Sequence, residues 1–368
     1  MCIDRPAPLP RRPCAQNETL TQQPVWIELF SGPATRLLSR PPSVAMLRTR
    51  VLTRCTSPSL TREGNHLASS TLGIKLNALK LERKLFISSN QRQQMESECG
   101  MDTQELLTSL VEVAQQFSLS EVSQFKVGAA GLGSSGNIYL GANIEFPFQP
   151  INNTVHAEQF LVTNAFQHGE PRLLSIALSA APCGHCRQFL NELVEGSRIR
   201  VNIPGVECVD PPLTLHELLP HSFGPGDLDC DARLLDGVRQ HVLTPLDGGP
   251  NGGVSSEERE AVAAAVDAAE RSYSPYTKSA SGVALRLKDG TMVCGSYLET
   301  AAFNPSLPPI QAALIGMVVQ GRQPKDIDSA VLVEIEHSAV QQAGQTKALL
   351  RQLAPHTKLA VHLCKHAQ

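Results

Sequence analysis

Apolar residues first recur with a helical period soon after residue 100. In the segment 102–117 they repeat at intervals of three and four, which predicts a helix with one buried face and Asp102 or Thr103 as its N-cap. The residues on that face are Leu106, Leu107, Leu110, Val111, Ala114 and Phe117. The segment 125–142 reads as two strands around a Gly/Ser turn at 133–136, which predicts a β-hairpin. A helix followed by two paired strands therefore opens a domain.

Helices and strands alternate beyond this hairpin. The pattern predicts a helix from about residue 156, a strand at 173–180, a helix at 183–195 and a strand at 198–203. Such alternation after a hairpin is typical of a mixed sheet covered by helices, and we expect a three-layer α/β/α sandwich.

The same order of elements recurs in the second half of the chain. A helix, a hairpin, a helix and a strand are predicted at 255–272, 281–295, 308–321 and 329–335. Five identical residues coincide at a constant offset of 154: Gly128 with Gly282, Gly136 with Gly290, Gly141 with Gly295, Glu145 with Glu299, and Ser175 with Ser329. The sequence therefore predicts a duplicated α/β domain.

Composition divides the chain further. At 368 residues and 42% hydrophobic, the chain can bury two ordinary cores. Residues 1–95 are rich in Arg, Ser, Thr and Pro and show no sustained period, and residues 244–253 have the Pro and Gly content of a linker. We expect an extension at 1–95, a catalytic domain at 96–243, a linker at 244–253 and a second domain at 254–368.

The extension at 1–95 has two interpretations. Organelle transit peptides are rich in Arg and Ser and poor in acidic residues, as this segment is. Alternatively, it is an unstructured segment, or translation begins at Met46, Met95 or Met101. The second interpretation gives a cytoplasmic protein and the first an organellar one. Of the ten cysteines only Cys183 and Cys186 form a close pair, which favours a reducing compartment over a secreted disulfide scaffold.

Charge narrows the class of substrate. Residues 1–95 contain 14 Lys and Arg against 5 Asp and Glu, which leaves 18 against 30 for the rest of the chain. A protein that binds a polynucleotide backbone usually has a basic surface. The acidic body therefore favours a small-molecule substrate and argues against a nucleic-acid partner. No apolar run approaches the roughly 18 to 20 residues of a membrane helix, which argues against a membrane partner.

Ionisable residues and cysteines stand where two of the predicted helices begin. His156 and Glu158 open one helix, and Cys183 and Cys186, spaced to share one face, open the next. A helix N-terminus stabilises thiolates. One imidazole and two thiolates form a set of three ligands that suits zinc and leaves its fourth position open for water.

Each of these features alone has an ordinary explanation. A lone cysteine pair more often serves packing or redox chemistry, and a lone histidine at a helix start is more often a capped, hydrogen-bonded residue. Their combination in this order is the signature of zinc deaminases, in which the glutamate is not a ligand but the general acid and base. We expect His156, Cys183 and Cys186 to hold zinc. Glu158 would take a proton from the activated water, deliver it to N3 of a pyrimidine and protonate the departing amine.

Several short motifs together carry a more specific resemblance. They are FKVGA (125–129), GANIEF (141–146), TVHAEQ (154–159), PCGHCRQF (182–189), NEL (191–193), LLPHSFGPGDL (218–228) and AAFNPSLPPIQAAL (301–314). From about residue 102 to 368 the chain resembles the cytidine deaminase family, in the two-domain homodimeric form of plants and enteric bacteria. The resemblance implies hydrolytic deamination of cytidine and 2′-deoxycytidine to uridine and 2′-deoxyuridine plus ammonia, in pyrimidine salvage.

The resemblance also implies substrate contacts. Phe125 would pack against the pyrimidine, Asn143 and Glu145 would bond the ribose hydroxyls, the backbone at Ala157 would contact the base, and Phe223 would close the partner subunit's pocket. Two residues apart on a strand end, Asn143 and Glu145 face the same side, and an amide with a carboxylate suits neutral hydroxyls. A solvated strand edge is the alternative interpretation of this pair.

The second copy lacks the metal ligands. At the offset of 154, His156 aligns with Ile310, Glu158 with Ala312, Cys183 with His337, and Cys186 with Val340. We therefore expect one zinc ion per chain. The second domain would cover the catalytic half and build a homodimer.

Three other classes of protein share part of this pattern. A polynucleotide or tRNA-editing deaminase would need a basic groove. A deoxycytidylate deaminase would need cationic residues for its phosphate. A structural zinc module would need neither Glu158 nor an open fourth position.

Overall fold

The computed structural model describes residues 85–203, 212–246 and 255–367. All of them belong to one compact unit, Thr61–Gln368. The interpretations placed on residues 1–84 and on most of the expected linker lie outside the described residues.

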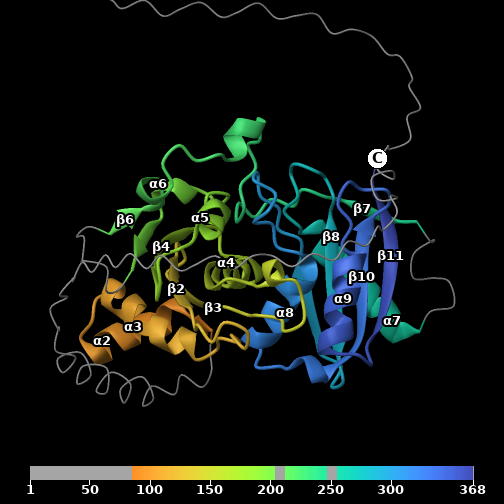
Figure 1. Cartoon of the computed structure of the whole chain (residues 1–368), viewed down its shortest axis with the longest axis horizontal. Helices are drawn as coiled ribbons and strands as arrows, with labels where there is room; N and C mark the ends of the chain where they lie inside the picture. Colours follow the sequence, from red (N-terminus) through yellow and green to blue (C-terminus); the bar gives the residue numbers. More distant parts are fainter. Residues whose placement is uncertain (1–84, 204–211, 247–254, 368) are drawn as a thin grey trace, which may run out of the picture. The chain divides into compact units, whose positions relative to one another are not determined.

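The first repeat is built on a mixed sheet (Figure 1). Its elements are β1 (Phe86–Ile87), α2 (Ser89–Cys99), α3 (Thr103–Gln115), β2 (Gly128–Gly133), β3 (Ile138–Ala142), α4 (Ala157–Gln167), β4 (Leu173–Leu178), α5 (Gly184–Leu190), β5 (Arg200–Asn202), β6 (Leu213–Thr214) and α6 (Leu215–Leu218). The strand order is β1-β3-β2-β4-β5-β6, with β4 and β5 parallel and the other neighbours antiparallel. The predicted hairpin and the alternation that follows it are confirmed.

Helices cover both faces of this sheet. A Cβ atom on Gly128 would lie 2.4 Å from the carbonyl oxygen of Val111 in α3. A Cβ atom on Gly141 would lie equally close, 2.4 Å, to the carbonyl oxygen of Ala157 in α4. Gly128 is paired with Ala142, the neighbour of Gly141, and successive strand residues face opposite sides. Helices α3 and α4 therefore lie on opposite faces, as the predicted three-layer α/β/α sandwich requires.

The second repeat has the same construction. Its elements are β7 (Leu243–Pro245), α7 (Ser256–Glu270), β8 (Ser281–Leu287), β9 (Met292–Ser296), α8 (Pro309–Val319), β10 (Ile327–Ile335), α9 (Ala343–Leu353) and β11 (Lys358–His366). Its strand order is β7-β11-β10-β8-β9, with β10 and β11 parallel. Gly282 approaches the backbone of α7, and Gly295 that of α8, as Gly128 and Gly141 approach α3 and α4. The predicted duplication is confirmed.

Two expected boundaries fall inside elements. Residue 95 lies in α2, where the Met95 side chain is buried, and β1 pairs with β3, so elements of the first domain lie before residue 96. At the other boundary, Thr244 and Pro245 belong to β7, which pairs with β11 of the second sheet. Strands as short as β1 and β7 span too few residues to show a period in the sequence.

The predicted helix at 183–195 is also shorter in the structure. Helix α5 ends at Leu190, and Glu195 has a positive φ of 52°. Between them Glu192 is fully buried and accepts a hydrogen bond from the backbone amide of Ala301 in the second repeat, at 2.6 Å. The backbone amide of Val194 donates to the Leu234 carbonyl at 3.1 Å rather than to a carbonyl of the preceding turn, so a tertiary backbone contact replaces the helical hydrogen bonds here.

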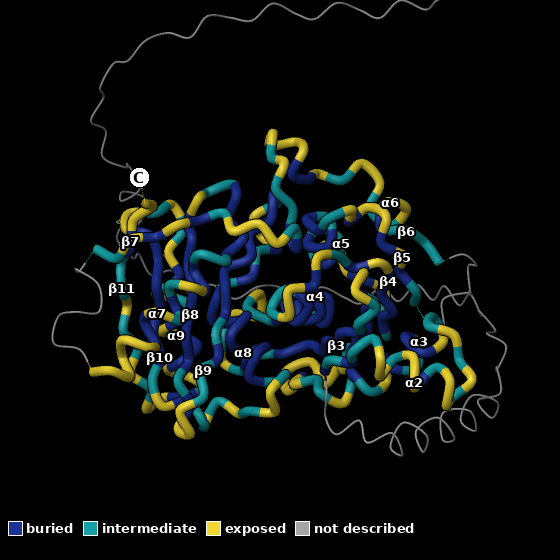
Figure 2. The backbone as a smooth tube through the Cα atoms, turned by 180° about the vertical axis from the view of Figure 1, so that it is seen from behind, coloured by how far each residue is buried: buried dark blue, intermediate teal, exposed yellow. Residues whose placement is uncertain are grey.

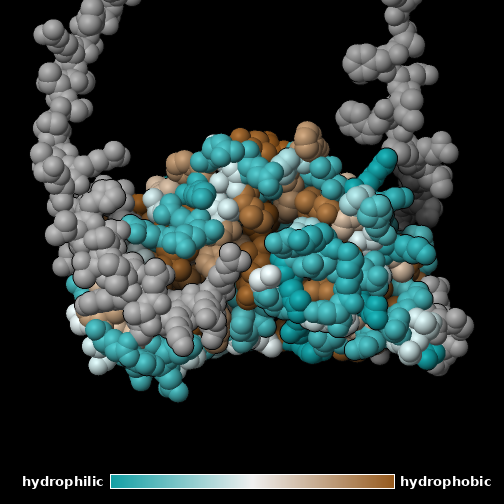
Figure 3. All heavy atoms as spheres, turned by 90° about the horizontal axis from the view of Figure 1, so that it is seen from below, coloured by the Kyte–Doolittle hydropathy of each residue, from teal (hydrophilic) through white to brown (hydrophobic). Residues whose placement is uncertain are grey.

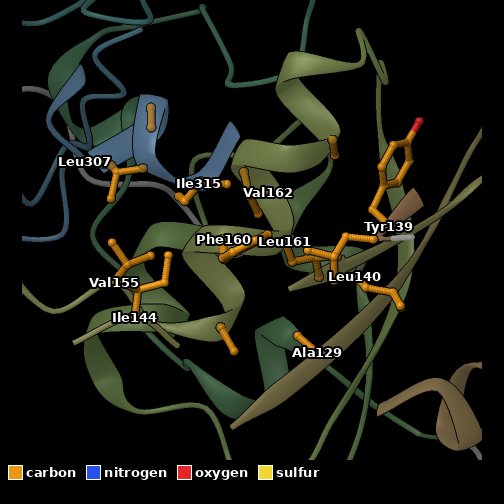
Figure 4. Close-up of a cluster of buried hydrophobic side chains, with 14 of the residues drawn as sticks. Ala129, Tyr139, Leu140, Ile144, Val155, Phe160, Leu161, Val162, Leu307 and Ile315 are labelled. Carbon is orange, nitrogen blue, oxygen red and sulfur yellow. The ribbon is translucent and has the colours of Figure 1, made fainter. Parts of the chain in front are cut away.

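Helices α4 and α8 pack against each other where the two repeats meet (Figure 1). All residues 157–165 of α4 and 309–317 of α8 are buried, and both helices are dark in Figure 2. Figure 4 shows Val162 of α4 beside Ile315 of α8, and both belong to one buried hydrophobic cluster. A helix whose residues are buried around its whole circumference must be covered on all sides. Here α4 is covered by its own sheet on one side and by the second repeat on the other.

Candidate active site and metal centre

The three expected metal ligands come together at the N-termini of α4 and α5. His156 is the N-cap of α4 and Cys183 the N-cap of α5. The Nδ1 atom of His156 lies 3.6 Å from Cys183 Sγ and 3.2 Å from Cys186 Sγ. All three donor atoms lie within 4.8 Å of one another, and no other such group of ligand residues is found among the residues that the structure describes.

The spacing of these atoms fits zinc. Zinc binds histidine nitrogen at about 2.0 Å and cysteine sulfur at about 2.3 Å in tetrahedral geometry, so bound nitrogen and sulfur atoms are about 3.5 Å apart. The two nitrogen–sulfur distances of 3.6 and 3.2 Å lie close to that value. Little movement of the side chains would therefore be needed to hold the ion.

Cys183 and Cys186 shift each other's pKa in opposite directions. Hydrogen bonding to Cys186, and then to His156, lowers the pKa of Cys183 to about 3. The hydrogen bond with Cys183 and burial raise the pKa of Cys186. One sulfur is thus a thiolate while its neighbour keeps the proton. A divalent cation in place of that proton would stabilise both thiolates, which is the state that metal ligation requires.

Glu158 lies beside the ligand group without belonging to it. It is the second residue of α4, and its side chain is 4% exposed. Burial raises the pKa of its carboxyl above the usual value, and hydrogen bonds to the backbone and to Cys186 oppose that shift. A buried carboxyl group next to the ligands is suited to carry protons there.

A backbone bridge joins the expected sugar-binding residues to this centre. Ile144 and Val155 exchange two backbone hydrogen bonds of 2.9 Å each. Val155 directly precedes His156, and Ile144 lies between Asn143 and Glu145. The structure therefore brings the Asn143–Glu145 segment next to the start of α4.

The side chains of Asn143 and Glu145 both form hydrogen bonds with the segment 118–127. Asn143 accepts hydrogen bonds from Ser118 Oγ at 2.6 Å and from the Val127 amide at 2.9 Å, and its Nδ2 donates to the Phe125 carbonyl at 3.0 Å. Glu145 accepts from the backbone amides of residues 122 and 123, each at 2.8 Å, and from the hydroxyl of residue 123. Both residues therefore shape the segment that carries Phe125.

The second repeat keeps one of these arrangements without a metal site. Glu299, fully buried, accepts from the backbone amides of Tyr276 at 2.9 Å and Thr277 at 3.2 Å, and from the Thr277 hydroxyl at 2.7 Å. These partners lie 154 residues after those of Glu145. A carboxylate at this position thus has an architectural role that does not depend on substrate.

The other expected contact residues differ in exposure. Phe125 is 61% exposed, and Phe223 is 45% exposed. The carbonyl of Phe223 accepts hydrogen bonds from Gln188 and Asn191, at the end of the helix that carries Cys186. Ala157, the first residue of α4, is fully buried between His156 and Glu158.

The correspondence between the repeats shifts by two residues at the central helices. Gly141 approaches the carbonyl of Ala157, whereas Gly295 approaches that of Pro309. The N-caps of the two helices are His156 and Pro308. The offset is thus 154 in the strands and 152 in these helices, because the connecting loop is two residues shorter in the second repeat.

The expected alignment of His156 with Ile310 and of Glu158 with Ala312 is therefore wrong. His156 corresponds to Pro308, and Glu158 corresponds to Ile310. Neither proline nor isoleucine offers a ligand or a titratable group, and the described residues of the second repeat contain no group of ligands like that of the first.

Two polar residues near the ligands escaped the sequence analysis. Gln159 and His185 lie inside the TVHAEQ and PCGHCRQF motifs, and their Nε2 atoms are 3.2 Å apart. The rings of His156 and His185 stack with centroids 5.4 Å apart. Their position next to the expected ligands in the sequence could have indicated a role at the site. The contacts between them, however, depend on how α4 and α5 pack.

Comparison with known proteins identifies the family. Two models of the cytidine and deoxycytidylate deaminase zinc-binding region match residues 101–200 and 215–347. A cytidine deaminase of Serratia proteamaculans is 46% identical over 255 residues, which cover 69% of this chain and 82% of that protein. One from Photorhabdus laumondii is 42% identical, covering 73% and 86%, and one from Vibrio cholerae is 38% identical, covering 74% and 88%. With its metal-ligand group intact, the chain belongs to the cytidine deaminase family.

Proposed function

We propose that the protein is a zinc-dependent cytidine deaminase, which converts cytidine and water into uridine and ammonia. The observation that carries this proposal is the group of His156, Cys183 and Cys186 beside the buried, non-ligating Glu158. The family membership supports the same reaction.

The expected metal ligands and Glu158 have separate roles in this reaction. His156, Cys183 and Cys186 would hold a zinc ion, which would lower the pKa of a bound water molecule. Glu158 accepts a proton from the attacking water and delivers it to N3 of the pyrimidine while the oxygen adds to C4. Glu158 would then take the remaining proton from the hydroxyl on C4 and pass it to the amine; the C4–N bond breaks to release ammonia as the C4=O bond of uridine forms. The wall that α8 adds behind α4 keeps bulk water away from the back of this site.

Asn143 and Glu145 retain bonding capacity for a sugar hydroxyl. An asparagine amide has two N–H groups, of which one is used within the described residues, and a carboxylate has about four acceptor positions, of which three are used. One donor and one acceptor suit a single hydroxyl. We therefore place a hydroxyl common to cytidine and 2′-deoxycytidine here, and we propose that both are substrates. Phe125 and the backbone at Ala157 would contact the base, and Phe223 would close the pocket of the partner subunit.

We further propose that the protein acts as a homodimer with one zinc ion per chain. Large apolar side chains at the surface support an interface: Phe148 is 91% exposed, Ile151 77% and Phe303 57%. The face in Figure 3 shows hydrophobic side chains gathered in its middle between hydrophilic margins. Apolar surface of this kind is commonly covered by a partner.

The cellular setting of the reaction is part of this proposal. None of the described helices combines the length and hydropathy that a bilayer crossing requires. We place the protein in the cytoplasm and its reaction in pyrimidine salvage. A reporter fused to residues 1–95 tests the location, because import of that fusion into an organelle would contradict it.

The purified protein tests the function directly. Cytidine, 2′-deoxycytidine and cytidine 5′-monophosphate are incubated with it, and ammonia release is followed with zinc content measured in parallel. We expect deamination of the two nucleosides and not of the nucleotide, loss of activity on zinc removal, and recovery when zinc is restored. Deamination of the nucleotide alone, or full activity without zinc, would refute the proposal.

A further inference from the structure

Two glutamines occupy equivalent positions in the central helices. Gln159 is the third residue of α4, and Gln311 is the third residue of α8, at the offset of 152 found for these helices. They are 2% and 3% exposed. Each side chain crosses to the other repeat: Gln159 Nε2 donates to the Pro305 carbonyl at 2.9 Å, and Gln311 Nε2 donates to the Asn153 carbonyl. Asn153 and Pro305 are also 152 residues apart, so the two bonds are reciprocal.

Only one of these glutamines also contacts the metal-ligand residues. The Oε1 atom of Gln159 accepts a hydrogen bond from the backbone amide of His156 at 3.1 Å. Its Nε2 atom lies 3.2 Å from His185 Nε2, in the segment between the two cysteines. One amide group thus joins the start of α4, the start of α5 and the second repeat. Pro308, which corresponds to His156 in the second repeat, has no backbone N–H, so Gln311 has no such bond to make.

The chemistry of the site explains why His156 needs this support. An N-cap side chain commonly satisfies a free amide of the first helical turn, but the imidazole of His156 faces the two sulfurs. Gln159, the third residue of α4, binds the His156 amide as in the reciprocal half of a capping box and so fixes the backbone from which the imidazole projects. The bond to the Pro305 carbonyl in turn determines which end of the Gln159 amide points at His156, because that carbonyl can only accept a hydrogen bond.

We propose that Gln159 is a positioning residue, through which the second repeat fixes the metal ligand His156. The inference rests on the proposed zinc site and gives the metal-free repeat a role in the chemistry of the first. In other metal sites, outer partners that orient a ligand affect metal affinity or activity by about 10- to 100-fold. The second repeat contributes its Pro305 carbonyl to such an outer contact.

The substitution Gln159→Met tests this role, with Gln311→Met as its matched control. Both remove one cross-repeat hydrogen bond at similar side-chain size, but only the first touches a ligand residue. Zinc loss to an excess of a chromophoric chelator is timed in the full-length proteins, well below their unfolding temperatures. We expect Gln159→Met to lose zinc about 10- to 100-fold faster and to lower kcat with little change in KM. Gln311→Met should release zinc at nearly the unsubstituted rate.

A second variant separates the contacts of Gln159 and serves if Gln159→Met does not fold. Gln159→Glu keeps an acceptor for the His156 amide but loses the donor to Pro305, so its rate of zinc loss should lie above that of the unsubstituted protein and below that of Gln159→Met. Zinc loss at the unsubstituted rate in both Gln159 variants, or equally fast loss in Gln311→Met, would overturn the positioning role alone. Absence of zinc from the unsubstituted protein would overturn the metal site and this inference with it.

Discussion

Glu158 is the residue on which turnover should depend most. Its carboxyl is buried beside the ligands but is not one of them. We expect Glu158→Ala to keep its zinc and to lose about 10²- to 10⁴-fold in kcat, which is the usual contribution of a general acid and base. Metal analysis beside a uridine assay checks this. A variant as active as the unsubstituted protein would exclude the proton-transfer role.

Substitutions at Glu145 and Glu299 distinguish an architectural role of the carboxylate from a role in binding substrate. Both carboxylates bind two backbone amides and a hydroxyl, but only Glu145 adjoins the metal centre. We expect Glu145→Gln and Glu299→Gln each to reduce the free energy of unfolding by about 1 to 3 kcal/mol, because an amide NH2 then faces backbone donors. Only Glu145→Gln should also raise KM for cytidine. Urea unfolding and initial rates measure the two effects, and an unchanged KM would leave Glu145 purely architectural.

At the scale of secondary-structure elements, close contact between a strand and a helix determines where the site lies. Strand β3 meets α4 at Gly141, and β9 meets α8 at Gly295, with no room for a side chain at either position. A methyl group on Gly141 would displace the helix turn that carries His156 and Glu158. The same change at Gly295 would displace a helix without such residues.

The two glycines therefore provide a matched test. We expect Gly141→Ala and Gly295→Ala each to destabilise the protein by about 1 to 3 kcal/mol, as overpacking commonly does. At a temperature where both variants stay folded, Gly141→Ala should lose more of its kcat than Gly295→Ala. Circular dichroism establishes the folded fraction and a uridine assay the rate. Equal activity in the two variants would mean that α4 absorbs the displacement without moving the site.

At the scale of the whole molecule, the buried residue Glu192 links the two repeats. Glu192, which no solvent reaches, accepts hydrogen bonds from Tyr273 at 3.2 Å, Tyr276 at 2.7 Å and the Ala301 amide at 2.6 Å. Burial raises the pKa of its carboxyl, and these hydrogen bonds, with the nearby charge of Arg233, oppose the shift. The ionised form therefore has a cost in the folded protein that it does not have in the unfolded chain.

The sign of this shift predicts how stability depends on pH. Because the folded pKa of Glu192 lies above the ordinary 4.5, its stabilising contribution is complete below 4.5 and is lost as pH rises through the folded value. The glutamine of Glu192→Gln does not titrate. We expect the unsubstituted protein to lose stability relative to this variant as pH rises above 4.5. Urea unfolding of both proteins over a pH series measures the difference, and a difference that stays constant with pH would contradict the shift.

The sequence alone was sufficient for the ligand set and for the duplication. His156, Cys183 and Cys186 stand at helix N-termini with local spacings that only a few kinds of site require, so their chemistry could be read before their geometry. The glycines at which helix and strand touch recur at one offset, because each close approach permits no other residue. Local rules of this kind act over a few residues and are therefore visible in the chain.

Tertiary structure alone decided how the repeats work together. The loop before α8 is two residues shorter than the loop before α4, so the residue equivalent to His156 is Pro308 and not Ile310. An alignment at one constant offset could not show this. The partner of Gln159, the Pro305 carbonyl, lies 146 residues away along the chain. Asn143 and Glu145 proved to bind the segment 118–127. The contact between Gln159 and Pro305 depends on the packing of the two repeats, and packing joins residues whose separation in sequence carries no periodic signal.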